Sequence, residues 1–308
     1  MRFSFSDEQL ALRDATRDLL ANECTPAHVR DAWTNETGRV PGLWEQLSDM
    51  GIVGMLAPES AGGLGLTFVD LVLVLEETGR FAVPEPVVET AAWGVPLLAR
   101  ADLTIAASEH WVPWADSADV IFTAAGRFER AEAELRSRPS VDGARRLFEV
   151  QGIPAPDAPG PADVLAAFER GVCGTAAQQC GLADRMLEMT ADYVRERRQF
   201  GVPVGSFQAV KHHLANARIA LEFARPLVYR AAASITSGDP DTSVHASMAK
   251  LKADTAAHLT GRAALQCHGA IGYTTEYDLH LYLKRSWALA RSWGNSRFHH
   301  DRVARAIL

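Results

Sequence analysis

Apolar residues recur at helical spacing through the first hundred residues of the chain. The pattern predicts four helices, at residues 6–22, 43–51, 67–79 and after Pro86. Ser6, with Gln9 three residues later, has the pattern of an N-cap, and a glycine-rich loop occupies residues 57–66. We therefore expect an N-terminal helical domain over residues 1–100.

The pattern changes between residues 101 and 161. Short β-prone runs, separated by Asp, Gly, Pro and Ser, lie at residues 111–114, 120–123 and 147–150. The proline-rich stretch 154–161 then predicts a stiff linker. Residues 101–161 are expected to form a reduced β segment and its linker, too short for a full β domain.

Long helical patterns return after residue 161. They cover residues 162–199, 207–237, 243–267 and 278–293, with a short tail to the C-terminus. The sequence GDPD at 238–241 predicts a turn between the second and third of these helices. Short loops between long helices favour antiparallel packing. The predicted fold class is mainly α, with an antiparallel four-helix bundle over residues 162–308.

Composition and charge exclude several classes of protein. With 308 residues and 47% hydrophobic content, the chain can bury a large core. The net charge of −7 argues against nucleic-acid binding, which favours a basic surface. No apolar run approaches the roughly 18 residues of a membrane span, and the N-terminus lacks a signal-like apolar segment. We expect a cytoplasmic protein with neither a nucleic-acid nor a membrane partner.

Cysteines and histidines give no metal site. The four cysteines contain no Cys-x-x-Cys pair, which is typical of a reduced compartment, and Cys173 and Cys180 are expected in the core. The histidines in 211–213 and 299–300 lack the i, i+4 pairing with a carboxylate that a helical metal site uses. We interpret both groups as surface or interface residues.

Candidate chemistry lies in two segments, 195–201 (RERRQFG) and 266–273 (QCHGAIGY). Each is expected where a long helix ends at a glycine turn. The first places cationic and aromatic side chains in a last helical turn. The second combines a Gln side chain with a tight glycine bend, so that amide groups can approach a phosphate or an adenine.

Together these segments resemble the two cofactor-binding segments of the FAD-dependent acyl-CoA dehydrogenase family. Residues 44–79, with PESAGGLG at 58–65 and EETG at 76–79, are similar to the family's first helical domain. The resemblance implies that a catalytic Glu removes the α-proton of an acyl-CoA while FAD takes a hydride from the β-carbon, giving a 2-enoyl-CoA. It also implies an FAD held across a subunit interface.

The resemblance assigns a role to individual residues in both segments. Arg197 matches the Arg that binds the FAD pyrophosphate, and Ala270 stands where the family usually has Gly. The implied cofactor-binding residues are Arg197, Phe200, Gln208, Gln266, His268, Gly269 and Ala270. The alternatives are a solvated, salt-bridged helix end at 195–198 and an ordinary helix C-cap at 266–268.

The chain departs from the family at the catalytic base. Trp293 occupies the usual base position and Gly171 a second one, so no catalytic residue is predicted. Glu169 is an alternative base, but two positions along a helix turn a side chain by about 200°. Its other interpretation is a solvated residue of the first helical turn. The flavin-binding motifs Thr-Glu-Pro-x-x-Gly-Ser-Asp and Trp-x-Thr/Ser-Asn do not occur between residues 101 and 161.

These departures lead to a functional hypothesis. The chain resembles the short subunits of actinobacterial heterotetrameric dehydrogenases that act on steroid side-chain CoA thioesters. The implied partner is a longer acyl-CoA dehydrogenase subunit in an α2β2 assembly, with a shared FAD, an acyl-CoA substrate in the complex and an electron-transfer flavoprotein. The alternatives are a non-catalytic structural or regulatory homologue, and a stand-alone dehydrogenase that uses Glu169.

Overall fold

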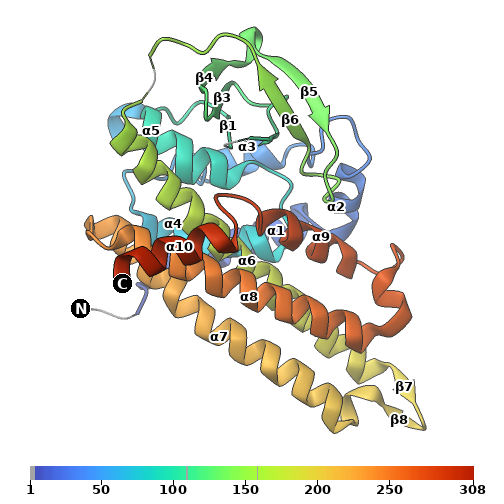
Figure 1. The fold of residues 1–308 in the computed structure, drawn as a ribbon. Coiled ribbons are helices and arrows are strands. Elements are labelled where there is room, and N and C mark those ends of the chain that lie inside the picture. Colours follow the sequence, from blue (N-terminus) through green and yellow to red (C-terminus); the bar gives the residue numbers. More distant parts are fainter. Residues whose placement is uncertain (1–3, 109, 158) are drawn as a thin grey trace.

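The computed structural model describes residues 4–108, 110–157 and 159–308. Long helices form one end of the molecule and a small strand region forms the other, with the N-terminal helices between them (Figure 1). The predicted mainly helical fold class is therefore confirmed. Among the described residues, no helix is long and apolar enough to cross a membrane.

The N-terminal part is helical, as its apolar pattern predicts. Its elements are α1 (Asp7–Glu23), α2 (Pro26–Ala32), α3 (Leu43–Asp49), η1 (Glu59–Ala61), α4 (Phe68–Arg80), the π-helical η2 (Val88–Gly94) and α5 (Val95–Leu98). Ser6 caps α1 through a reciprocal pair of hydrogen bonds with Gln9, which confirms the predicted N-cap. Helix α2 was missed, although Thr25 as N-cap followed by Pro26 is a start signal.

The strand region contains two small three-stranded sheets. One has the order β1 (Ile105–Ala107), β3 (Val120–Thr123), β4 (Gly126–Glu129), and the other β2 (Val112–Pro113), β6 (Leu147–Gln151), β5 (Glu134–Arg138). A 3-10 turn, η3 (Arg130–Glu132), joins β4 to β5. The β1 and β3 pair is parallel and the others are antiparallel. The strands at 120–123 and 147–150 were predicted, whereas β5 is too charged to signal a strand and forms by pairing with β6.

The helical end is built from α6 (Pro161–Glu196), α7 (Gln208–Ser237), α8 (Thr242–His268) and α9 (Leu279–Leu289), followed by α10 (Ser296–Ile307). The short turns η4 (Val204–Ser206) and η5 (Gly269–Tyr273) precede α7 and α9. Helix α6 contacts α7, α8 and α9, as a bundle requires. The prediction of a short tail without a helix after residue 293 is wrong, because α10 lies there. Trp293 and Gly294, with φ of +57° and +91°, keep α9 and α10 from forming one continuous helix, and Asn295 caps α10.

Helices α4 and α6 cross at a pair of glycines. A Cβ atom on Gly79 would lie 2.1 Å from the carbonyl oxygen of Gln178, and one on Gly181 would lie 1.9 Å from the carbonyl oxygen of Glu76. Only glycine permits this approach of two backbones. Buried residues from both ends of the chain, Cys173 and Cys180 among them, form one continuous hydrophobic core at this crossing. The division into three domains remains a prediction.

Charged residues of α4 reinforce the crossing. Glu76 accepts hydrogen bonds from the Arg225 Nε and the Tyr229 hydroxyl of α7, both at 2.7 Å. Glu77 accepts from Arg17 of α1, at 2.6 Å and 3.0 Å. Glu76 and Glu77 are buried, and because a buried charge needs a partner, these pairs tie α4 to both neighbouring helices.

We expect Gly181→Ala to lower the free energy of unfolding by roughly 2–3 kcal/mol, because the added methyl group forces α4 and α6 apart. Urea denaturation of the purified chain measures this difference. Gly160→Ala is the matched control, since among the described residues its Cβ meets only the Asp163 carboxylate, at 3.2 Å. Equal stability of the two variants would contradict the close crossing.

A second buried carboxylate makes stability depend on pH. The Glu85 side chain is fully buried, accepts a hydrogen bond from the Arg39 Nε at 2.5 Å, and leaves its Oε1 without a partner among the described residues. Burial raises the pKa of Glu85 to about 7, although the charge of Arg39 opposes this shift. The folded chain therefore holds this proton at pH values where the unfolded chain has released it.

A raised pKa of the folded state stabilises the protein below the unfolded pKa of about 4.3, and this contribution is lost as pH rises toward 7. Between pH 5.5 and 7.5 we expect the free energy of unfolding to fall by on the order of 2 kcal/mol through Glu85. Glu85→Gln should remove most of this decrease in urea denaturation at both pH values. An identical pH dependence in the variant would show that Glu85 does not titrate there.

Candidate functional site

The first candidate segment forms a β-hairpin rather than the predicted last turn of a helix. Helix α6 ends at Glu196, and β7 (Arg198–Gln199) pairs with β8 (Val202–Pro203). Phe200 and Gly201, with φ of +54° and +83°, form the two-residue turn between these strands. Positive φ at both central residues fits the twist of a tight hairpin. The helix ends before the hairpin, because Arg197 is already in an extended conformation with ψ of 124°.

The hairpin faces the end of α8 across a cleft of about 640 Å³. We call this cleft the half-site. The predicted cofactor-binding residues that line it are Arg197, Phe200, Gln266, His268, Gly269 and Ala270. Gln208 does not line it: the side chain is exposed at the start of α7, between Phe207 and Ala209, which do. Two segments about 70 residues apart in sequence thus meet at one end of the bundle.

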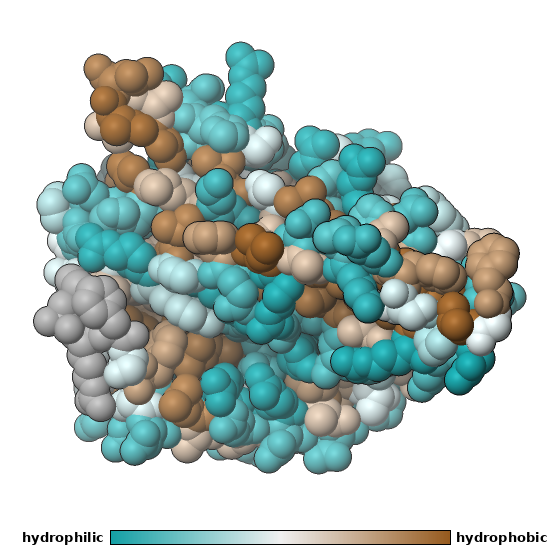
Figure 2. Space-filling model, turned by 90° about the horizontal axis from the view of Figure 1, so that it is seen from below, coloured by the Kyte–Doolittle hydropathy of each residue, from teal (hydrophilic) through white to brown (hydrophobic). Residues whose placement is uncertain are grey.

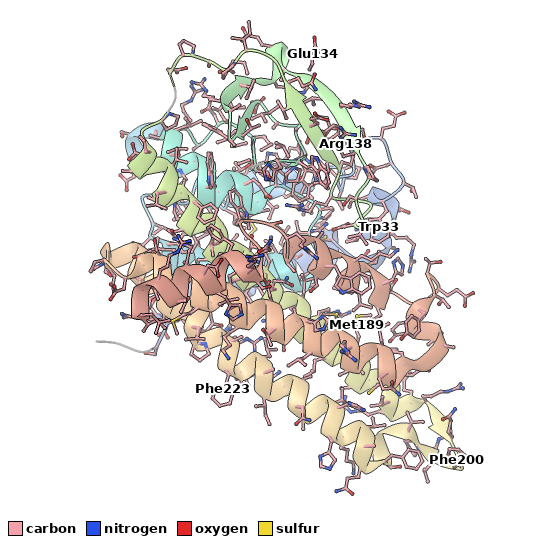
Figure 3. The ribbon with its side chains drawn as sticks, in the orientation of Figure 1. Trp33, Glu134, Arg138, Met189, Phe200 and Phe223 are labelled. Carbon is pink, nitrogen blue, oxygen red and sulfur yellow. The ribbon has the colours of Figure 1, made fainter. Side chains whose placement is uncertain are left out.

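Arg197 and Phe200 have few contacts within the chain. Arg197 is exposed and forms no ion pair among the described residues, whereas Arg195 is paired with Asp192 at 2.8 Å. Of the arginines in segment 195–198, only Arg195 is therefore part of a salt bridge among the described residues, as the alternative interpretation of this segment predicts. Phe200 is 91% exposed at the tip of the hairpin, and the centroid of its ring lies 6.3 Å from that of Phe207 (Figure 3). Both side chains are open to a ligand or a partner.

His268 is buried and lines the half-site. Its ring stacks on Tyr193 at 4.4 Å and lies 4.7 Å from Tyr277. Nδ1 lies 2.8 Å from the Ala264 carbonyl oxygen, and burial lowers the pKa of His268, which keeps the ring neutral. A neutral Nδ1–H then donates to that carbonyl. The sequence reasoning missed both tyrosines, although Tyr193 lies one helical turn before Arg197.

The end of α8 requires glycine at one position only. Gly269 has φ +65° and ψ −139°, a conformation that L-residues rarely adopt, and nothing lies within 4 Å of a Cβ added there. Ala270 has no positive φ and is exposed, so an Ala fits at the position where the resemblance implies a Gly. The backbone at Gly269 and Ala270 remains accessible from the cleft.

The two positions that the resemblance assigns to the catalytic base lie against each other. A Cβ atom on Gly171 would lie 2.8 Å from Cδ2 of Trp293, so the indole covers this glycine. Trp293 also stacks on Trp93 at 6.3 Å and meets the edge of Phe168 at 6.2 Å. Aromatic rings occupy the space that the resemblance assigns to a carboxylate, and none of these groups can accept a proton.

Glu169 is not the solvated residue that the sequence predicted. It is only 4% exposed, and it accepts hydrogen bonds from Ser243 Oγ at 2.8 Å and from the Arg302 guanidinium of α10. The carboxylate therefore fastens α10 to α6 and α8. A base that removes a substrate proton needs a lone pair directed at the substrate, whereas both carboxylate oxygens of Glu169 accept hydrogen bonds from residues of this chain.

The interpretation of His299 as a surface residue is wrong. Its side chain is fully buried, with Nε2 2.9 Å from the Trp293 carbonyl oxygen and Nδ1 3.1 Å from Ser247 Oγ. Burial lowers the pKa of His299 to about 4. His300 and residues 211–213 are exposed, as expected. His299 thus holds the backbone of Trp293 in place.

Comparison with known families identifies the class of protein. The N-terminal domain of acyl-CoA dehydrogenases matches residues 6–102, and the C-terminal domain matches residues 160–308. Acyl-CoA dehydrogenase IpdE2 of Mycobacterium tuberculosis is 32% identical over 307 residues, covering 92% of each chain. IpdE2 of Mycolicibacterium smegmatis is also 32% identical, over 95% of this chain and 96% of that protein. The chain belongs to the acyl-CoA dehydrogenase family.

Solved structures share the whole fold. A chain of the Tcur3481–Tcur3483 steroid ACAD, solved as a variant, superposes with a TM-score of 0.89 at 23% identity and covers 98% of each chain. A chain of the ChsE4–ChsE5 complex from Mycobacterium tuberculosis gives 0.88 at 23% identity, over 100% of this chain and 99% of that one.

The contact between Trp293 and Gly171 predicts strong coupling. Gly171→Ala should destabilise the chain by about 1–3 kcal/mol because its methyl group collides with the indole. In a Trp293→Ala background the same change should cost almost nothing. A double-mutant cycle in urea measures the coupling, and additive effects would contradict the observed packing.

Proposed function

We propose that this chain is the short subunit of a heteromeric acyl-CoA dehydrogenase, and that its half-site completes the FAD site of a longer partner subunit. The observation that carries the proposal is a contrast within one molecule. The cleft lined by Arg197 and Phe200 is open, while the base positions at Trp293 and Gly171 are filled by aromatic packing.

The residues of the half-site fit FAD. Arg197 offers a guanidinium without an ion-pair partner among the described residues, which suits a pyrophosphate. The Gln266 side chain and the backbone at Gly269 and Ala270 suit the adenosine part. When bound, FAD supplies the hydride acceptor for α,β-desaturation of an acyl-CoA. This chain's residues would hold its nucleotide half, and the partner would supply the base and the ring pocket.

Exposed apolar side chains support assembly with a partner. Besides Phe200, the outer face of α7 exposes Phe223 by 73% and Ile219 by 54%. Figure 2 shows this side of the molecule, where apolar residues are interspersed with hydrophilic ones, and Figure 3 labels Phe223 on α7. We propose an α2β2 heterotetramer in the cytoplasm, reoxidised by an electron-transfer flavoprotein.

A steroid side-chain CoA thioester is the substrate class that we propose for the complex. The support is indirect: one structural relative is described as a steroid ACAD. Of the alternatives, a stand-alone dehydrogenase that uses Glu169 conflicts with the buried ion pair of that carboxylate with Arg302. The other alternative is a non-catalytic structural homologue, and the flavin content of the complex separates it from our proposal.

Arg197→Ala is expected to lower the FAD content of the complex formed with the longer subunit, and to weaken FAD binding by about tenfold or more through the lost phosphate contact. The measurement is the flavin absorbance per complex, followed by FAD titration of the stripped complex. The matched control is Arg198→Ala, because Arg198 is equally exposed but does not line the half-site.

Two results would count against the proposal. One is an Arg197→Ala complex with unchanged FAD affinity, which would favour the structural homologue. The other is an Arg198→Ala complex that loses as much flavin as the Arg197 variant, which would indicate a diffuse electrostatic effect.

A further inference from the structure

A groove of about 460 Å³ lies between α7 and α8, next to the half-site. We call it the α7–α8 groove. His213 and Gln266 line both the groove and the half-site, so the two adjoin. The other residues that matter here are Asn216 of α7, Leu259 and Arg262 of α8, and Tyr273 of η5.

Apolar side chains continue from the groove along the outer face of α7. Ile219 and Phe223 follow Asn216 at steps of three and four residues, so they lie on the same side of the helix. They are 54% and 73% exposed, and Leu259 in the groove is 46% exposed. Phe223 lies on the outside of α7 (Figure 3). Large exposed apolar side chains on neighbouring helices are typical of a surface that another chain covers.

The unpaired charges beside this apolar centre are positive. Lys252 and Arg262 are exposed on α8, and neither forms an ion pair with any described residue. Arg218 and Glu222 of α7 balance each other at 2.7 Å. Asp254, the single acidic residue of α8, pairs instead with a buried lysine of the same helix. This face therefore offers two cations that no carboxylate of α7 or α8 neutralises.

These charges favour a different chain over a second copy of this one. A copy related by a twofold axis would present the same face, with Lys252 and Arg262 unpaired on both sides. Like charges brought together at an interface are unfavourable, whereas a partner with carboxylates gains from them. In the proposed function the adjoining half-site contacts the longer subunit, so one partner can cover both the half-site and the groove.

We propose that the α7–α8 groove and the apolar face beside it are a docking surface for the longer subunit. The partner covers Ile219, Phe223 and Leu259 with apolar side chains and places Asp or Glu side chains opposite Lys252 and Arg262. This inference rests on the proposed function, since it names the protein contact that adjoins the half-site. An apolar centre with a polar rim is the usual arrangement of such an interface.

The test is the association of this chain with the longer subunit, measured by surface plasmon resonance at low and high salt with FAD saturating throughout. Phe223→Ala should weaken association about tenfold or more, mainly through faster dissociation, because buried aromatic side chains anchor interfaces. The double variant Lys252→Gln and Arg262→Gln should lower the association rate and reduce its dependence on salt. Saturating FAD separates these effects from a loss of flavin.

The matched controls lie in the strand region, away from the groove. They are Ile153→Ala, an exposed apolar residue, and Arg136→Gln, an exposed arginine. Neither change should alter the affinity or its salt dependence. Because all the substituted side chains are exposed, thermal unfolding curves of the single chains should overlay with that of the unmodified chain.

The outcomes distinguish this inference from the proposed function. If Phe223→Ala associates normally while Arg197→Ala loses FAD, the docking surface is wrong and the proposed function stands. If Phe223→Ala instead reduces self-association of the chain alone, measured by sedimentation, the occupant is a second copy and the inference is wrong. If the unmodified chain does not associate with the longer subunit, the proposed function fails and the inference fails with it.

Discussion

The backbone contact between α4 and α6 is the constraint on which the rest of the structure depends. Gly79 and Gly181 let the two helices touch, and the buried charges of α4 secure α1 and α7 around them. Helix α6 has 36 residues and spans about 54 Å. One of its ends carries the half-site hairpin and the other carries Glu169 and Gly171. The crossing with α4 therefore fixes the positions of both ends of α6, and with them the half-site hairpin and the region around Glu169.

The two regions use their residues in opposite ways. At the half-site, the exposed side chains of Arg197 and Phe200 line the cleft and make few contacts within the chain. Around Trp293, the described side chains named above are paired within the chain: Trp293 stacks on Trp93, His299 lies against the Trp293 carbonyl oxygen, and Glu169 is paired with Arg302. Exposed side chains without contacts are available to a ligand or to another subunit, whereas side chains packed against each other are not. This asymmetry is the physical basis for our proposal that the chain completes the cofactor site of a partner.

Much of the fold could be predicted from the sequence, because long helices carry strong periodic patterns and Ser6 with Gln9 is a local signal. The members of the half-site could also be predicted, since the two segments resemble known motifs. What failed depended on tertiary contacts. The hairpin turn needs a positive φ at Phe200, which the residue type does not signal, β5 forms only against β6, and the burial of Glu169 and His299 depends on α10, which the sequence pattern did not reveal.

The ion pair that holds α10 against α6, between Arg302 and Glu169, affects which substitutions this chain can tolerate. A carboxylate at position 293 would enter an apolar niche beside Trp93 and Phe168, and the ring that now covers Gly171 would be lost at the same step. Freeing Glu169 instead would leave Arg302 without its partner and loosen the C-terminal helix. Either change made alone would thus lower the stability of the chain. If the chain depends on a partner, as we propose, that dependence would be hard to reverse by single substitutions.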